Sequence, residues 1–358
     1  ASHESYRGND FTVVGGKARG IVGNFVVLAS DANVFEKVVR TQQGRSLGDS
    51  TDYERAVSVL PRDRIATAYL DTVRSLESAA RSAGGSASQL AALGPLTTLA
   101  PIAVGVFLRG DGIVVDGAIH RSGPVSISRG PGLLARLPAD TRAALSVPQV
   151  GPGLSDLFSA PSSSTAHLAL GALLKARTGL DLDSDLLSWM GDVAFFVTDI
   201  AHLRGGAVVE SSAPATSRRV VEQIGESLLS RGLDVTLTPR TPQQSAFKVR
   251  SRHLPTLHVT ASKSDVQAIF GSVPLASDEL HLGDEPMFER AETSLGQDYS
   301  IKGFVDARTL VSYFERGSAG STALPATAKA AVRPLSFIGL GTRSDRDTLF
   351  ARLVIGVN

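Results

Sequence analysis

Two separate segments of the chain carry nearly the same sequence, LGDSTDYERA in residues 47–56 and LGDEPMFERA in residues 282–291. The match continues downstream without a gap. An internal repeat predicts that one fold unit was duplicated, and it constrains the fold more than any other feature. The identical positions of the first copy are Leu47, Gly48, Asp49, Glu54, Arg55, Ala56, Leu60, Asp63 and Asp71, opposite Leu282, Gly283, Asp284, Glu289, Arg290, Ala291, Leu295, Asp298 and Asp306.

Both copies predict the same order of secondary structure. Apolar residues at helical spacing follow Asp49 and Asp284, and each aspartate is expected to cap the first turn of that helix. Short strands are predicted over residues 64–71 and 299–306, and Asp71 and Asp306 are expected to cap the helices that come next. β-Hairpins are then predicted over residues 102–120 and 338–357. The unit is therefore helix, strand, helix and hairpin.

The second copy has a front section without a counterpart in the first. Residues 192–200 and 204–211 are predicted as antiparallel strands, and residues 215–232 as an amphipathic helix that ends at Gly232. Residues 233–240 and 245–252 are predicted as two more strands. Upstream of the opening match, residues 26–38 resemble residues 257–270.

Strands and helices without regular βαβ alternation indicate an α+β fold with antiparallel sheets. We expect a tandem duplication, with a partial first copy in residues 1–130 and a complete second copy in residues 131–358. The first copy begins abruptly near Tyr6, so we expect it to be truncated at its N-terminus. A partial duplication, with Ala1 near the true mature start, is the alternative.

Composition excludes several classes of protein. Lys and Arg number 36 against 35 acidic residues, which argues against a nucleic-acid or anionic-membrane surface. The chain has no cysteine, so thiol nucleophiles, disulfides and cysteine-bound metals are excluded, although the compartment is not decided. The longest apolar run, residues 99–108, is about half of the roughly 20 residues that span a bilayer.

The sequence contains none of the usual phosphate-binding, dinucleotide-binding, zinc-protease or hydrolase motifs. His253 and His258 are the closest histidine pair. Their spacing across a proline does not place both on one face of a strand, so a metal site is disfavoured. Ser245 and Lys248 match the SxxK pattern of serine–lysine hydrolases, but the segment alternates as a strand would, which points the two side chains apart.

The segment DLDSD, residues 181–185, resembles the start of a calcium loop. Its sixth and twelfth positions are Leu186 and Asp192 instead of glycine and glutamate. We therefore favour a helix start capped by Asp183 or Ser184, with Leu186, Leu187 and Met190 buried.

The neighbouring charges Glu54–Arg55 and Glu289–Arg290 are interpreted as exposed or salt-bridged helix residues, because adjacent helical positions point about 100° apart. Trp189, the single tryptophan, is interpreted as a core or interface aromatic. No residue is predicted to be catalytic, to bind a cofactor or to hold a metal, and no cofactor is expected.

Several segments together resemble the bacterial family named domain of unknown function 3352, over nearly the whole chain. The resemblance implies an exported or membrane-anchored envelope protein with two related halves and a hydrophobic N-terminal segment. It implies no activity, ligand or catalytic residue. An LPADT block before the first half would complete the family pattern, and its absence here supports truncation. The segments are FVVLASDANVFEKVV, SLGDSTDYERA, YLD, LPADT, TGLDLDSDLLSWMGD and LGDEPMFERA.

We expect a non-enzymatic binding or scaffolding protein outside the cytoplasm, anchored only through a preceding segment. Its partner would be a lipid or another envelope protein, and not nucleic acid. A curved sheet around apolar helices could enclose a cavity for an apolar ligand, gated by the small-residue loops SAGGSAS and APSSSTA. The alternatives are a hydrolase whose serine or carboxylate pair comes from distant segments, and a protein–protein module with an exposed apolar patch.

Overall fold

The computed structural model describes residues 1–42, 44, 46–75, 78, 100–110, 112–120, 132–159, 164–238, 241, 243–252, 254–271, 281–315, 330, 332–345 and 347–357. These residues form two compact units, Ala1–Val59 and Leu60–Asn358. The described strands pair antiparallel throughout, and helices pack on them, which confirms the α+β class. The predicted boundary between the two copies at residue 130 stays a prediction.

The first unit is a four-stranded meander, β1-β2-β3-β4, with helix α1 packed on β3 and β4. Its core centres on Phe11 and Phe35, whose rings stack with centroids 4.4 Å apart. Gly20 allows this close packing, since a Cβ there would lie 2.8 Å from the Phe35 ring. The elements are β1 Ser2–Tyr6, β2 Asn9–Val14, β3 Lys17–Val22, β4 Phe25–Ala29, α1 Ala32–Gln42, the 3₁₀ turn η1 Leu47–Asp49 and α2 Thr51–Ser58.

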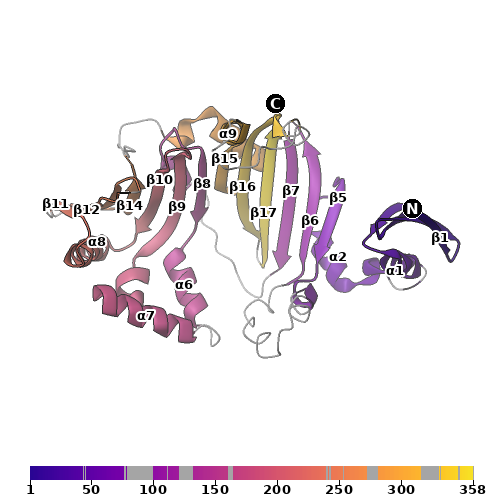
Figure 1. Cartoon of the computed structure of the whole chain (residues 1–358), viewed down its shortest axis with the longest axis horizontal. Helices are drawn as coiled ribbons and strands as arrows, with labels where there is room; N and C mark the ends of the chain where they lie inside the picture. Colours follow the sequence, from indigo (N-terminus) through magenta and orange to yellow (C-terminus); the bar gives the residue numbers. More distant parts are fainter. Residues whose placement is uncertain are drawn as a thin grey trace. The chain divides into compact units, whose positions relative to one another are not determined.

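In the second unit, thirteen of the described strands form one antiparallel sheet (Figure 1). The order across the sheet is β11-β12-β13-β14-β10-β9-β8-β15-β16-β17-β7-β6-β5. The strands are β5 Ala66–Leu70, β6 Ile102–Arg109, β7 Gly112–His120, β8 Ala143–Val147, β9 Met190–Asp199, β10 Arg204–Ser211, β11 Val235–Thr238, β12 Ser245–Val249, β13 Leu257–Ala261, β14 Asp265–Phe270, β15 Ser300–Asp306, β16 Leu335–Asp345 and β17 Thr348–Val357.

Two cores lie on opposite faces of this sheet. On one face, α9 and the turns η2 and η4 bury Phe288, Leu295 and Phe337 against the central strands. On the other face, α8 and the π-helical turn η3 bury Trp189 and Val220 against β10 to β14. The helical elements are η2 Leu134–Arg136, α6 Val150–Ser159, α7 Ser164–Thr178, η3 Leu182–Leu187, α8 Pro214–Ser230, η4 Leu282–Asp284, α9 Pro286–Leu295 and α10 Ala307–Glu315.

Strand order around the β17–β7 pair is the same in both directions. Outward from this pair the order is β17-β16-β15 on one side and β7-β6-β5 on the other. These are the strand and hairpin that the sequence predicts for each copy. The two four-stranded series β1 to β4 and β11 to β14 also share their order. A duplication would produce this arrangement, and the duplication itself stays a prediction.

The repeated aspartates have two different local roles. Asp71 and Asp306 cap the helices that follow, since the backbone N–H groups of Arg74 and Thr309 donate to their carboxylates at 3.0 and 3.1 Å. That prediction is confirmed.

Asp49 and Asp284 do not cap α2 and α9 as predicted. Each carboxylate instead accepts the backbone N–H three residues earlier, from Ser46 at 2.7 Å and His281 at 3.0 Å. The reason is that each aspartate is the last residue of a 3₁₀ turn, so its side chain reaches back over that turn.

The predicted match between residues 26–38 and residues 257–270 is wrong as a structural correspondence. The first segment forms the end of β4 and then helix α1, whereas the second forms the hairpin β13–β14. Both segments begin with an apolar strand, and this similarity was sufficient to align them by sequence. Across the described residues, no helix combines the length and apolarity needed to cross a membrane.

Candidate functional site

The SxxK pair lies on strand β12, as predicted. Ser245 is 3% exposed and Lys248 points to the exposed side, so the two groups cannot act together. Lys248 stands opposite His258 on β13. Burial, and then the charge of Lys248, lower the pKa of His258. His253 lies outside the described residues.

The DLDSD segment forms the π-helical turn η3, capped by Asp181 and not by Asp183 or Ser184. The Asp181 carboxylate accepts the backbone N–H groups of Asp183 and Ser184 at 3.2 and 3.1 Å, which lowers its pKa. The sequence analysis placed the cap two residues too late because it took the acidic residues as the start of a regular helix. Leu187 is buried, and Leu186 and Met190 are partly buried.

The remaining candidates have structural roles. Trp189 is 4% exposed in the α8 core, and its indole N–H donates to the Asp185 carbonyl at 2.7 Å. Arg55 pairs with Asp52 at the surface, and Arg290 lies over the ring of Phe337. Among the described residues, no group of three or more His, Asp or Glu is placed to hold a metal ion.

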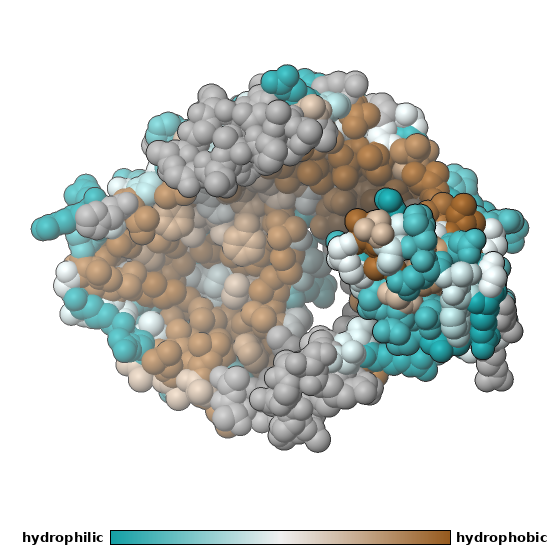
Figure 2. All heavy atoms as spheres, turned by 45° about the vertical axis from the view of Figure 1, so that its right-hand side comes forward, coloured by the Kyte–Doolittle hydropathy of each residue, from teal (hydrophilic) through white to brown (hydrophobic). Residues whose placement is uncertain are grey.

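A pocket of about 950 Å³ opens on the sheet face that α8 only partly covers. Figure 2 shows hydrophobic residues, drawn in brown, gathered over this hollowed surface. Among the described residues, the lining has a single charged residue, Arg204, and no Ser, Thr, His, Asp, Glu or Lys. The lining residues are Ala143, Ala144, Leu145, Phe195, Phe196, Val197, Ile200, Leu203, Arg204, Gly205, Gly206, Ala207, Leu254, Pro255, Ala268, Phe270, Gly303, Phe304, Val305, Ile338, Leu340 and Leu353.

Strand register explains how this pocket forms. Residues directly opposite one another on neighbouring strands present their side chains on the same face. Two rows of such neighbours cross the pocket, and both contain Gly or Ala among large side chains, which leaves a hollow beside the large ones. The rows are Leu353, Leu340, Gly303, Leu145, Phe195, Ala207 and Ala268, and Ile338, Val305, Ala143, Val197, Gly205 and Phe270.

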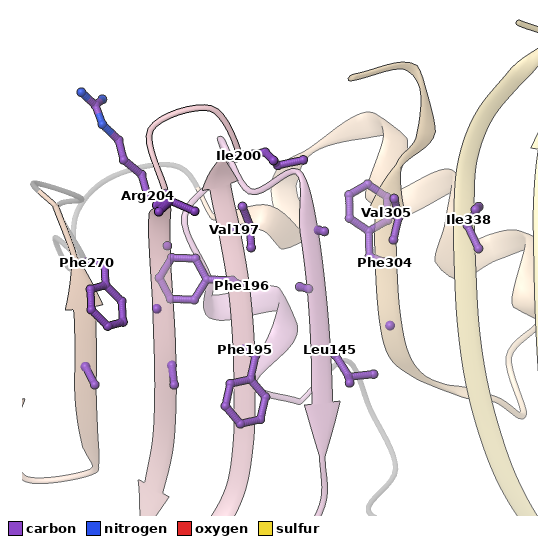
Figure 3. A pocket seen from close by; sticks show the side chains of 18 of the residues that line it. Leu145, Phe195, Phe196, Val197, Ile200, Arg204, Phe270, Phe304, Val305 and Ile338 are labelled. Carbon is purple, nitrogen blue, oxygen red and sulfur yellow. The ribbon is translucent and has the colours of Figure 1, made fainter. Parts of the chain in front are cut away.

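Strand β9 shows why the lining is exposed. Phe196 is 3% exposed because it packs into the core beneath α9, whereas its neighbour Phe195 is 51% exposed. Leu145, opposite Phe195 on β8, is 46% exposed. In Figure 3 Phe195 and Leu145 project into the pocket from adjacent strands. An antiparallel sheet often has one apolar and one polar face, but here both are apolar and one lacks a full cover.

The sequence suggests an apolar cavity, but none of these lining residues was predicted from it. A signal was present, because the run VAFFV in β9 is apolar at every position and therefore apolar on both faces of a strand. That run indicates that both faces of strand β9 are apolar. It does not indicate which of the two faces remains without a covering helix. The proposed gate SAGGSAS and most of APSSSTA lie outside the described residues.

One end of the pocket, which we call its mouth, lies at the β9–β10 turn, where Ile200, Leu203 and Arg204 line it. Arg204 begins β10 and is exposed, and its guanidinium extends away from the sheet in Figure 3. Asp199 stands opposite Arg204, but its carboxylate binds elsewhere. Its oxygens accept the N–H groups of Ala201 and His202 at 2.9 and 3.2 Å, and one lies 2.6 Å from His202 Nδ1. The contact with the His202 ring, followed by these backbone bonds, lowers the pKa of Asp199.

Comparison with known sequences identifies the family. No curated protein and no solved structure matches the chain. The sequence profile of the family described as "Protein of unknown function (DUF3352)" matches residues 2–349, which is nearly the whole chain. The chain therefore belongs to the DUF3352 family, as its sequence motifs predicted.

Proposed function

We propose that this chain is a non-enzymatic binding protein that holds an apolar ligand in the pocket on the open sheet face. The observation that carries the proposal is the lining, in which every described residue except Arg204 is Ala, Val, Leu, Ile, Phe, Gly or Pro. Water in such a pocket finds few hydrogen-bond partners, so an apolar ligand gains free energy by replacing it. The volume of about 950 Å³ lies in the upper part of the usual range for small-molecule sites.

The same lining argues against hydrolysis at this pocket. A serine or carboxylate mechanism needs a nucleophile and a base within hydrogen-bond reach of the substrate. The lining residues offer neither group. We therefore propose binding over the hydrolase alternative.

Native mass spectrometry of protein purified without detergent tests the proposal. A bound apolar molecule would add mass to the native protein, and this mass would be lost on denaturation. The Phe195→Asp variant places a charge on an exposed lining position and is expected to lose the added mass.

Leu108→Asp is the matched control. Leu108 is 65% exposed on β6 and lies outside the lining. This variant is expected to keep the ligand. Trp189 fluorescence would show that both variants remain folded. Equal ligand content in the two variants would contradict the proposed site, and a native protein that binds no added fatty acid or detergent would contradict the proposed function.

A second candidate function is protein–protein interaction through α7. Leu168, Leu170 and Leu173 are 73%, 45% and 55% exposed. The helix therefore presents leucines to solvent as well as to η3 and α8, on which it packs. Size-exclusion chromatography of a variant with all three leucines changed to Gln tests this candidate. A self-association that the variant abolishes would support it, and identical profiles would count against self-association.

We also propose an extracytoplasmic location, which the resemblance to exported envelope proteins supports. Cell fractionation with a cytoplasmic and a periplasmic marker protein would test it. Recovery with the cytoplasmic marker alone would refute this part of the proposal.

A further inference from the structure

The apolar pocket has an asymmetric arrangement of charge. Of the lining residues that the structure describes, only Arg204 is charged; it lies at the mouth, whereas the floor is formed by apolar side chains of β8, β9 and β15. A wholly neutral ligand would contact the apolar floor and would form no ion pair with the Arg204 guanidinium. A ligand with an apolar tail and an anionic head would contact the floor with its tail and Arg204 with its head.

Arg204 has no ion pair or hydrogen bond among the described residues. Asp199, its cross-strand neighbour, would be the natural partner for an ion pair. The strand register shifts between Arg204 and Gly205, and the Asp199 carboxylate is already bound by the N–H groups of its own turn and by His202. The guanidinium donors therefore remain available for a ligand.

The stem of Arg204 also follows the pocket edge. Its Cγ lies 3.3 Å from where a Cβ on Gly271 would stand, which places the stem beside the end of β14 and next to Phe270. The aliphatic part of an arginine commonly covers apolar surface while its head stays in water. Arg204 can thus contact the tail with its stem and the head group with its guanidinium.

The charges at the mouth indicate how much negative charge the ligand carries. Asp199 has a lowered pKa, so it is ionised at neutral pH and offsets part of the positive potential. This carboxylate would repel a phosphate monoester with two charges more strongly than a ligand with one charge. A carboxylate has one charge, and the planar guanidinium can hold it with two parallel hydrogen bonds.

On this basis, and resting on the proposed function, we propose that the pocket binds a long-chain fatty acid, with the acyl chain on the apolar floor and the carboxylate at Arg204. The acyl chain supplies affinity because burying its CH₂ groups removes apolar surface from water. The arginine selects an anionic head over a neutral one.

Isothermal titration with palmitic acid and with its methyl ester tests this assignment. Wild-type protein is expected to bind the acid about tenfold more tightly than the ester, since a hydrogen bond to a charged group is worth more than one to a neutral group. Arg204→Gln is expected to weaken binding of the acid to the level of the ester and to leave the ester unchanged.

Arg62→Gln removes the same charge from an exposed position just before β5 and is expected to change neither affinity. Arg204→Lys keeps the charge without the planar fork and is expected to retain part of the preference. High salt should reduce the preference for the acid in wild-type protein.

The outcomes separate the two proposals. If wild-type protein binds the acid and the ester equally, or if Arg204→Gln keeps the preference, the role of Arg204 is refuted and the apolar pocket stands. If lysophosphatidic acid binds more tightly than palmitic acid, the assignment to a carboxylate is refuted. If neither amphiphile binds, both the fatty-acid assignment and the proposed function fail.

Discussion

The buried ion pair between Arg352 and Asp116 joins β17 to β7, where the two predicted copies meet in the sheet. Arg352 Nε lies 2.6 Å from Asp116 Oδ1 and Nη2 lies 2.8 Å from Oδ2, while Nη1 donates to the Leu295 carbonyl of α9 at 2.9 Å. The side chains are only 14% and 4% exposed. Burial alone would lower the pKa of Arg352, but its hydrogen bonds with Asp116 raise it above the usual value.

We predict that removing either partner alone is costly. Breaking a buried pair leaves an uncompensated charge, which typically costs about 3–5 kcal/mol. Arg352→Met leaves the more deeply buried Asp116 without a partner, so its loss of unfolding free energy should reach the upper part of that range. Asp116→Leu should cost about 3 kcal/mol, because Arg352 keeps a little solvent contact and its bond to Leu295, and lies over the Tyr299 ring at 4.3 Å.

The double variant Asp116→Leu/Arg352→Met should cost less than either single change, since no charge is left unpaired and apolar residues fill the site. Urea denaturation followed by Trp189 fluorescence and by circular dichroism would give the unfolding free energies, and the two probes should coincide if the unit unfolds cooperatively. The reasoning would be refuted if the two single effects simply add, or if each is below about 1 kcal/mol.

The control for this cycle is the exposed pair of Arg109 with Asp63. These side chains are 43% and 66% exposed, with 3.6 Å between the charged atoms. Asp63→Ala should change the unfolding free energy by less than about 1 kcal/mol. A loss as large as that of Asp116→Leu would show that burial does not decide the effect.

Three further predictions concern other parts of the second unit. Phe288→Ala should lower the unfolding free energy by about 3–5 kcal/mol in urea denaturation, because this side chain is 0% exposed. The N–H of Asp181 and then Arg219 lower the pKa of Asp185 from its ordinary 3.8, so this carboxylate stabilises the fold above that pH. Asp185→Asn should therefore destabilise at pH 7, and its difference from wild type should shrink in thermal melts as the pH falls below 3.8. Gly205→Ala should cost at least about 3 kcal/mol, since φ is +153° and a Cβ would overlap a neighbouring carbonyl; equal melting temperatures would contradict this.

Local patterns in the sequence determined most of the secondary structure. The short apolar, strand-like segments in residues 192–200 and 204–211 predicted β9 and β10, and the helical spacing before Gly232 predicted α8. These predictions hold because strand and helix periodicity depend on neighbours within a few residues. The same dependence on near neighbours explains the errors at Asp49 and Asp284. A single 3₁₀ turn there makes each carboxylate accept a hydrogen bond from a preceding residue and not from the helix that follows.

The family was also recognisable from the sequence, because each of its motifs is a contiguous stretch of residues. No comparable signal exists for the pocket. Its walls come from residues as distant as Leu145, Ala207 and Leu340, and each looks like an ordinary strand residue by itself.

The sequence by itself therefore determined the elements, the repeat and the exclusion of thiol chemistry. Tertiary structure alone decided which apolar face stays open, since α9 covers one side of β15 and β16, whereas on the other side α8 packs mainly on β11 to β13. Strand register then placed Gly303 beside Leu145 and Ala207 beside Phe195, so that small residues adjoin the large ones. A hollow of this kind depends on pairings between distant strands, and periodicity along one strand does not encode them.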